Sequence, residues 1–182
     1  PIAGAESFSE NFTNEIGAEN TVRFLKNITG MWLVQKCRES WKRTGRDAGY
    51  RELEREAALA EPGRTVFDVD SPDFSMPDDM PSAIAEHCRA RSIAVPRTRG
   101  EMFRAIQESV AAKYAAVFGG MKKISGVDFD RICIMGGGSK DSMLNQFAAD
   151  ATGCEISAGP TESTAFGNAV MQMKASGDIS SV

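Results

Sequence analysis

Three consecutive glycines, Gly136 to Gly138, are the feature of the sequence best suited to chemistry. They follow the apolar run Ile132 to Met135, which predicts a buried parallel strand. Ser139 can cap a helix that we expect to begin near Lys140. Glycines have no Cβ, so they allow positive φ angles and let a ligand approach the backbone closely, and the amides at a helix N-terminus attract anions. The stretch therefore predicts a gap of the size of a phosphate group.

The glycines fit neither of two common nucleotide-binding motifs. A P-loop ends in Gly-Lys-Ser/Thr, whereas here the order is Gly-Ser-Lys. A dinucleotide fingerprint requires a glycine or alanine three positions after Gly138, where this chain has Asp141. A tight strand-to-helix turn without any ligand explains a bare triple glycine about as well as a binding site does.

The residues after the glycines predict a helix, a second strand and a second helix. The first helix buries an apolar stripe made of Met143, Leu144, Phe147 and Ala151. Gly153 is placed to end it. Cys154 to Ser157 predicts the second strand, and Pro160 with Thr161 opens the second helix. This order predicts a right-handed βαβ crossover with the glycine turn after its first strand.

Two amide side chains, Asn27 and Gln35, belong to a long predicted helical region from Ala18 to about Thr44. Its apolar stripe runs through Phe24, Ile28, Met31 and Gln35. Helical geometry puts Gln35 on the same face as Phe24, with Asn27 at the edge of that face. A buried unpaired amide costs about 1–3 kcal/mol, so both side chains need partners. From composition alone, bonds to neighbouring backbone groups are the favoured explanation.

The remaining pattern predicts a strand over 10–16 and helices over 50–60, 82–91 and 99–122, the last capped by Thr98. Residues 64–81 contain three prolines and several aspartates, and they predict an irregular segment in which 66–69 is extended. The aspartates do not have the spacing of a calcium loop, so turns and caps explain them better. We expect Trp32 and Trp41 in the core, and we expect His87 to be a surface or packing residue and not a base.

Length and charge narrow the class of protein. A chain of 182 residues with 42% hydrophobic content predicts one globular domain. The net charge of −4 argues against nucleic acid and anionic membranes as partners. Four cysteines without a CxxC pair and a single histidine predict no metal cluster and a reduced, cytoplasmic setting, with Cys133 and Cys154 in the core. No apolar run approaches the roughly 20 residues of a membrane-spanning helix.

The sequence around these motifs resembles a known family. The blocks that carry the resemblance are Asn14-Glu15, the stretch 24–35, Ala94-Val-Pro96, Gly-Gly-Gly-Ser at 136–139, Leu-Asn-Gln at 144–146, Ala-Asp-Ala-Thr-Gly at 149–153, and 158–168. In this order they resemble the C-terminal domain of the FGGY family of carbohydrate kinases, over about Asn11 to Ile179. The chain has Glu-Ile-Gly at 15–17 where the family has Glu-Gly-Gly.

The resemblance implies an α/β chain with an actin-like, ribonuclease H-like ATPase fold. We expect the C-terminal half of such a kinase over 1–182, rich in helices and with a small, incomplete mixed sheet. In this family ATP binds in the cleft between two halves, and its γ-phosphoryl group passes to a sugar hydroxyl with Mg²⁺. The resemblance is closest to members that phosphorylate L-rhamnulose at its 1-hydroxyl. Kinases for xylulose, fuculose or glycerol, and a non-catalytic scaffold that keeps the fold, remain alternatives.

The resemblance also assigns residues. Gly137 matches the family's nucleotide-contacting glycine, with Gly136 and Gly138 beside it. Asn27 and Gln35 match two further nucleotide positions, which favours a ligand over the backbone explanation. The catalytic Asp, the sugar-binding residues and the N-terminal phosphate loop are expected in an N-terminal sugar-binding domain before Pro1, so no catalytic residue is expected here and this chain alone is expected to be inactive.

The ends of the chain are expected to be cut. It starts at Pro1 without a methionine, and the match implies that the first strands of the domain are missing and that the end after Ile179 is early. A sheet without its outer strands exposes unpaired edges, so self-association through an exposed edge is expected.

Overall fold

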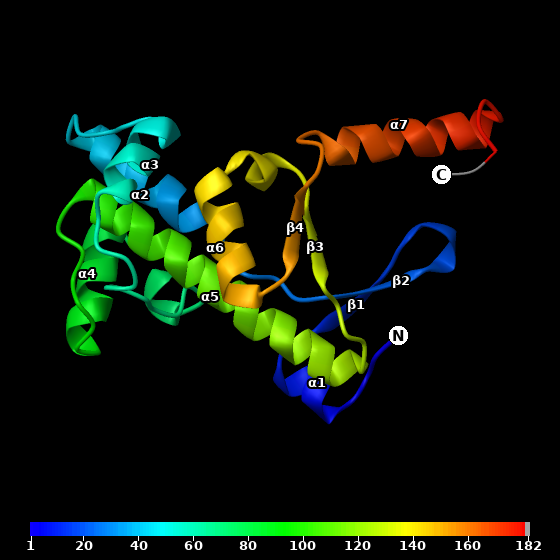
Figure 1. Cartoon of the computed structure of the whole chain (residues 1–182), viewed down its shortest axis with the longest axis horizontal. Helices are drawn as coiled ribbons and strands as arrows, with labels where there is room; N and C mark the ends of the chain where they lie inside the picture. Colours follow the sequence, from blue (N-terminus) through cyan, green and yellow to red (C-terminus); the bar gives the residue numbers. More distant parts are fainter. Residues whose placement is uncertain (181–182) are drawn as a thin grey trace. The chain divides into compact units, whose positions relative to one another are not determined.

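The computed structural model describes residues 1–180, which form two compact units. The first unit comprises Pro1–Asp128 and the second begins at Phe129. The longest element of the first unit is the helix α5, Arg99–Ser125, drawn in green in Figure 1. The side chain of Thr98 accepts a hydrogen bond from the Glu101 N–H at 3.1 Å, and the Glu101 carboxylate accepts one from the Thr98 N–H at 3.3 Å. This capping box confirms the predicted start of the helix.

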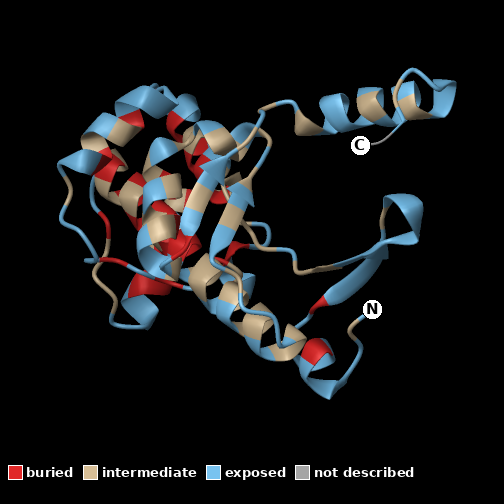
Figure 2. Cartoon of the chain, turned by 45° about the vertical axis from the view of Figure 1, so that its right-hand side comes forward, coloured by how far each residue is buried: buried red, intermediate tan, exposed pale blue. Residues whose placement is uncertain are grey.

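Three further helices pack with α5 to form the core of the first unit. They are α2 (Trp32–Arg43), α3 (Tyr50–Ala58) and α4 (Met80–Ala90), which confirms the helices predicted over 50–60 and 82–91. Figure 2 shows buried residues in red along these helices. The fully buried side chains include Leu33, Cys37, Leu53, Ile84, Phe103 and Ile106. Trp41 is buried as expected, whereas Trp32 is half-buried.

The prediction of one helix from Ala18 to Thr44 was wrong. The chain instead forms an antiparallel hairpin of β1 (Thr13–Ile16) and β2 (Val22–Leu25), and α2 begins only at Trp32. A short helix, α1 (Ala5–Ser9), precedes β1, so the strand predicted over 10–16 forms only from Thr13.

The hairpin has a local cause in the sequence. A turn over 18–20 connects the strands, and Glu19 and Asn20 there have φ angles of 57° and 59°. Asparagine tolerates this left-handed region better than most residues. The β-branched Thr21 and Val22 and the aromatic Phe24 then favour the extended backbone of a strand over a helix. Phe24 stacks on Phe12 with ring centroids 4.7 Å apart, and this contact holds the hairpin to the N-terminal segment.

The segment 64–81 is irregular, as predicted, and contains one short 3-10 helix, Pro72–Phe74. The stretch 66–69 is not a strand. Several of its side chains are nevertheless in the core, among them Val69 and Phe74. The Phe67 N–H donates to the buried Ser109 hydroxyl at 3.1 Å. Packing and side-chain hydrogen bonds therefore hold this segment without a sheet.

Hydrogen bonds and ion pairs also account for the aspartates of this segment. Asp79 caps α4, where its carboxylate accepts from the Ser82 N–H. Asp73 Oδ2 lies 2.7 Å from Nδ1 of His87, a buried side chain that packs against Phe74 and so confirms its role in packing. Among residues 1–180, no group of three or more His, Cys, Asp or Glu side chains is placed to hold a metal ion.

The second unit is a βαβ unit followed by a helix. The parallel strands β3 (Arg131–Ile134) and β4 (Glu155–Ala158) flank α6 (Ser142–Thr152), and α7 (Ser163–Ser176) follows. This order confirms the predicted strand-helix-strand-helix succession. Gly153 adopts the left-handed conformation and ends α6, as predicted.

Two burial predictions for the second unit were wrong. Cys133 is exposed, because Arg131 and Cys133 lie on one face of β3 and the half-buried Ile132 and Ile134 on the other. Ala151 is exposed, while α6 buries Leu144 and Ala148 at the i, i+4 spacing of one helix face. Cys154 is buried, as expected.

None of the helices in the described part of the chain is long and apolar enough to cross a membrane.

The contact of α3 with α5 predicts a stability difference between two glycines of α5. A Cβ on Gly100 would lie 2.6 Å from the carbonyl carbon and oxygen of Glu56, whereas a Cβ on Gly119 would meet nothing within 4 Å. Gly100→Ala should therefore lower the free energy of unfolding by about 1–3 kcal/mol, because α3 must move away. Gly119→Ala should raise it by about 0.5–1 kcal/mol through helix propensity. Urea unfolding measures both, and equal effects would contradict a close contact at Gly100.

Self-association of the chain remains a prediction, and the strand pairing gives it a physical basis. Within residues 1–180 each strand pairs with one neighbour only, so each sheet has two unpaired edges. On the β1–β2 hairpin, Ile16 is 84% exposed and Val22 is 42% exposed. Light scattering of this chain should show an apparent mass that rises over a roughly tenfold increase in concentration. A constant monomer mass over that range would refute the edge argument.

Candidate functional site

Of the three glycines, Gly136 alone has a positive φ angle, 81°. It lies two positions after the end of β3, and its N–H donates to the Pro160 carbonyl at 3.1 Å. Its own carbonyl accepts from the Ser139 N–H at 3.1 Å and from the Ser139 hydroxyl at 2.7 Å. Gly136 therefore has a structural task, because it reverses the chain in a conformation that residues with a Cβ rarely adopt.

Gly137 and Gly138 begin a short 3-10 helix, Gly137–Lys140, and present their backbone outward. Gly137 is exposed, and a Cβ built on it would meet nothing within 4 Å. Within residues 1–180, no acceptor is found for the N–H of Gly137 or of Gly138. Two adjacent backbone N–H groups without a protein acceptor are donors that suit an anion.

The helix after the turn is capped by Asp141 and not by Ser139. Asp141 Oδ1 accepts from the Leu144 N–H at 2.9 Å at the start of α6. The prediction of a Ser139 cap was wrong because the 3-10 helix separates the glycines from α6 and turns the Ser139 hydroxyl back to Gly136. The known preference for aspartate at N-caps was a sequence signal for Asp141.

Asn145 ties α6 to the glycine turn. Its Nδ2 donates to the Ser139 carbonyl at 3.2 Å. Its Oδ1 is buried, and no donor for it is found among the described residues. The sequence block that contains Asn145 thus supports the shape of the turn, a role that its sequence pattern did not reveal.

Asn27 and Gln35 do not share a helix. Asn27 lies in an irregular segment between β2 and α2, and Gln35 lies near the start of α2. Both residues are exposed, and neither side chain forms a hydrogen bond with another of the residues 1–180. The stripe that was expected to join Phe24 to Gln35 is therefore absent. The explanation by backbone partners also receives no support, and both amides are available to a ligand.

A cavity of about 350 Å³ lies beside the segment after Asn27. Its walls include Ile28, Gly30, Trp32, Asp70 and Phe74. The volume is in the range of small-molecule sites. Sequence reasoning missed Asp70 as a wall of this cavity, because 42 positions separate it from Ile28 and no local pattern connects the two.

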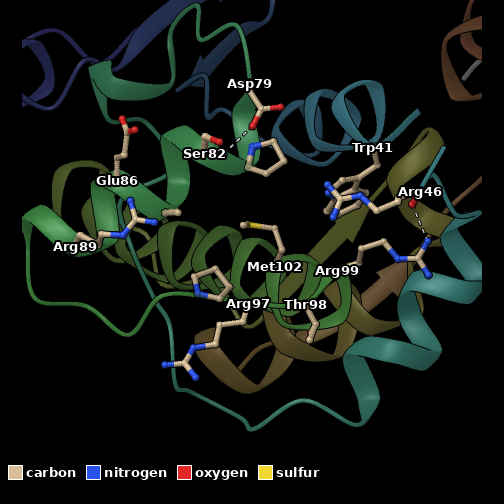
Figure 3. Close-up of a pocket in the computed structure, with 13 residues that line it drawn as sticks. Trp41, Arg46, Asp79, Ser82, Glu86, Arg89, Arg97, Thr98, Arg99 and Met102 are labelled. Atoms are coloured by element: carbon tan, nitrogen blue, oxygen red, sulfur yellow. Dashed lines mark hydrogen bonds between the residues drawn. The ribbon is translucent and has the colours of Figure 1, made fainter. Parts of the chain in front are cut away.

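A second cavity, of about 330 Å³, lies between α2, α4 and the start of α5 (Figure 3). Trp41 and Met102 supply apolar wall. Asp79 is used there as the cap of α4, and Arg99 donates to the Arg46 carbonyl at 2.7 Å and pairs with Glu52. None of the five expected site residues lines this cavity.

The five expected residues thus divide between the two units. Gly136, Gly137 and Gly138 form one turn of the second unit, and Asn27 and Gln35 present free amides from the first unit. The chemistry available at each place is hydrogen bonding by uncharged groups, which suits recognition of a ligand.

Comparison with known proteins adds family information to this geometry. The sequence profile described as FGGY family of carbohydrate kinases, C-terminal domain, matches residues 1–176. The rhamnulokinase of Bacteroides thetaiotaomicron is 42% identical over 182 residues, which is 100% of this chain and 37% of that protein. The rhamnulokinase of Enterococcus faecalis is 39% identical, with 98% of this chain and 36% of that protein covered. That of Bacillus subtilis is 35% identical over 100% of this chain. The chain therefore spans little more than a third of these relatives.

Because Gln35 is exposed, Gln35→Leu should change the free energy of unfolding by less than about 0.5 kcal/mol. Leu33→Ala, two positions earlier in α2, is the matched control. Leu33 is 0% exposed, so its truncation should lower the free energy of unfolding by about 2–5 kcal/mol. Urea melts of the two variants measure this difference, and a large loss of stability in Gln35→Leu would mean that the amide has a structural partner.

Proposed function

The chain belongs to the FGGY family of carbohydrate kinases as its C-terminal domain, and we propose that it is the nucleotide-side domain of a kinase that phosphorylates L-rhamnulose. The observation that carries this proposal is the match of the whole chain to rhamnulokinases. The free amides of the glycine turn support it, because a nucleotide-side domain needs donors for an anionic ligand.

In this proposal ATP supplies the γ-phosphoryl group for the 1-hydroxyl of the sugar, in a reaction assisted by Mg²⁺. The Gly137 and Gly138 N–H groups donate hydrogen bonds to a phosphate oxygen. The space beside Gly137, where a Cβ would meet no protein atom within 4 Å, is the space that the ligand takes.

The amides of Asn27 and Gln35 are proposed to form hydrogen bonds with a ligand of the kinase from the first unit. Each side chain offers two donors and an acceptor, a combination that can recognise a base or a hydroxyl. Their exposure and their lack of partners among residues 1–180 support this role. Because both are uncharged, they orient the ligand and do not neutralise its charge.

The general base and the sugar contacts are assigned to the rest of a full-length kinase, in an N-terminal sugar-binding domain that the relatives' length leaves room for. We assign no magnesium ligand to this chain, since its described residues include no suitable cluster of carboxylates. A cytoplasmic setting is part of the proposal, and the four free thiols support it.

Gly137→Ala and Gly136→Ala in the full-length kinase that carries this chain test the proposed nucleotide contact. Gly137→Ala should raise the KM for ATP about tenfold and leave stability nearly unchanged, because its methyl group enters ligand space only. Gly136→Ala should lower the free energy of unfolding by about 1 kcal/mol or more, because alanine resists a φ of 81°. An unchanged KM for ATP in Gly137→Ala would show that this turn is structural only.

The same assay separates the alternative substrates. A coupled assay of ADP release with L-rhamnulose, xylulose, fuculose and glycerol should give the highest kcat/KM for L-rhamnulose. A preference for another sugar would move the protein to another branch of the family. Absence of turnover with every sugar, in a folded full-length protein, would support the scaffold alternative.

A further inference from the structure

We propose that Asp70 is a positioning residue, which holds the segment that carries Asn27 in the geometry that ligand binding needs. The inference rests on the proposed function, because it takes Asn27 as a ligand contact. Asp70 lies outside the sequence blocks that resemble the family.

The carboxylate of Asp70 connects two distant parts of the first unit. Its Oδ1 accepts a hydrogen bond from the Thr29 N–H at 2.7 Å, and its Oδ2 lies 3.0 Å from Nζ of Lys113 on α5. Thr29 is only two residues after Asn27. Asp70 therefore links the Asn27 segment to the longest helix of the chain.

The segment from Asn27 to Gly30 has little else to hold its backbone. It belongs to no helix or strand, and the Gly30 carbonyl accepts only the local bond from the Leu33 N–H at 3.4 Å. In the described residues, the bond from Thr29 to Asp70 is the one hydrogen bond that joins the backbone of 27–30 to a part of the chain distant in the sequence. An irregular segment with a single anchor changes its conformation when that anchor is removed.

The surroundings make this anchor stronger than a surface ion pair. The side chains of Lys113 and Asp70 are 19% and 26% exposed, so solvent screens the pair only in part. Burial opposes the charge of Lys113, but its hydrogen bonds with Asp68 and Asp70 outweigh that effect and raise the pKa of Lys113. The lysine thus stays charged and keeps the carboxylate oriented toward Thr29.

Asp70 and Thr29 also line the same cavity of about 350 Å³, together with Trp32. A loss of the bond between Asp70 and Thr29 changes a wall of this cavity as well as the path of the segment. Asp70 thus acts on the site through Thr29, which lines the cavity and belongs to the segment that carries Asn27.

Asp68 provides a control for the charge that pairs with Lys113, and its Oδ1 also accepts a hydrogen bond from the Asp70 N–H at 3.1 Å. Its Oδ1 lies 2.9 Å from the same Lys113 Nζ, yet its side chain forms no bond with the segment from Asn27 to Gly30. Asp68→Ala and Asp70→Ala each remove one carboxylate from the lysine, and only Asp70→Ala releases Thr29. A purely electrostatic role of the pair would give similar effects in both variants.

The experiment compares Asn27→Ala, Asp70→Ala and Asp68→Ala in the full-length kinase. Asn27→Ala should raise the KM for one substrate, ATP or L-rhamnulose, about tenfold, and Asp70→Ala should raise the KM for that same substrate by about fivefold to tenfold. Asp68→Ala should stay within about twofold of the wild type. The double variant Asn27→Ala/Asp70→Ala should be no worse than Asn27→Ala alone, because both changes remove the same contact.

Hydrogen–deuterium exchange without any ligand gives a second readout. Asp70→Ala should speed exchange in 26–31 about tenfold or more and leave α5 unchanged, whereas Asp68→Ala should not affect 26–31. If Asp70→Ala fails to fold, Asp70→Asn serves instead. The amide oxygen of this variant still accepts from Thr29, but the charge that pairs with Lys113 is lost. The KM should therefore rise less than in Asn27→Ala, and the exchange rate in 26–31 should rise in proportion to the KM.

The outcomes separate the inference from the proposed function. If Asn27→Ala leaves the KM for both substrates unchanged, the assignment of Asn27 as a ligand contact fails. If Asn27→Ala raises a KM but Asp70→Ala changes neither that KM nor exchange in 26–31, the positioning role of Asp70 is overturned. Equal effects of Asp68→Ala and Asp70→Ala would also overturn it.

Discussion

The close contact of α3 with α5 is the constraint on which the first unit depends. Gly100 permits it, since any larger residue would meet the Glu56 backbone at 2.6 Å. The contact places Phe103 and Ile106 in the core and fixes the direction of α5. Farther along the same helix, Lys113 holds Asp70, and Asp70 holds the backbone at Thr29. The position of the Asn27 segment therefore depends on the packing of α3 against α5 at Gly100, through Lys113 and Asp70.

Neighbouring glycines in the turn of the second unit have different roles. Gly136 supplies the positive φ angle that the turn after β3 requires, Gly137 and Gly138 leave their amides without a protein acceptor, and the space beside Gly137 is open. Asn145 supports the turn from α6 through the Ser139 carbonyl. A short motif thus combines a residue with a structural role and neighbours whose backbone N–H groups have no protein acceptor, so substitutions one position apart are expected to have different consequences.

The sequence predicted the elements whose signals are local and strong. Helix α5 had a capping residue and a long apolar stripe, and the βαβ unit had a short apolar strand followed by glycines. The hairpin at 13–25 was missed, because the helical period from Phe24 to Gln35 outweighed the turn residues Glu19 and Asn20. Local composition at 21–24 favoured a strand, but a four-residue strand has few positions in which alternation can show. Asp70 and Gly100 could not be predicted, because their importance comes from partners more than 40 residues away along the chain.

The expected ligand contacts of this chain are all uncharged groups: backbone amides of glycines and the carboxamides of Asn27 and Gln35. The chain has a net charge of −4, so its net charge provides no long-range attraction for a nucleotide polyphosphate. Backbone amides and carboxamides recognise shape and hydrogen-bonding pattern, and they lose little when salt is added. Neutralisation of the phosphates during transfer requires cations, which uncharged contacts do not supply. The contribution that we propose for this domain is therefore orientation of a ligand through hydrogen bonds, and the proposed role of Asp70 is to keep the Asn27 segment in place.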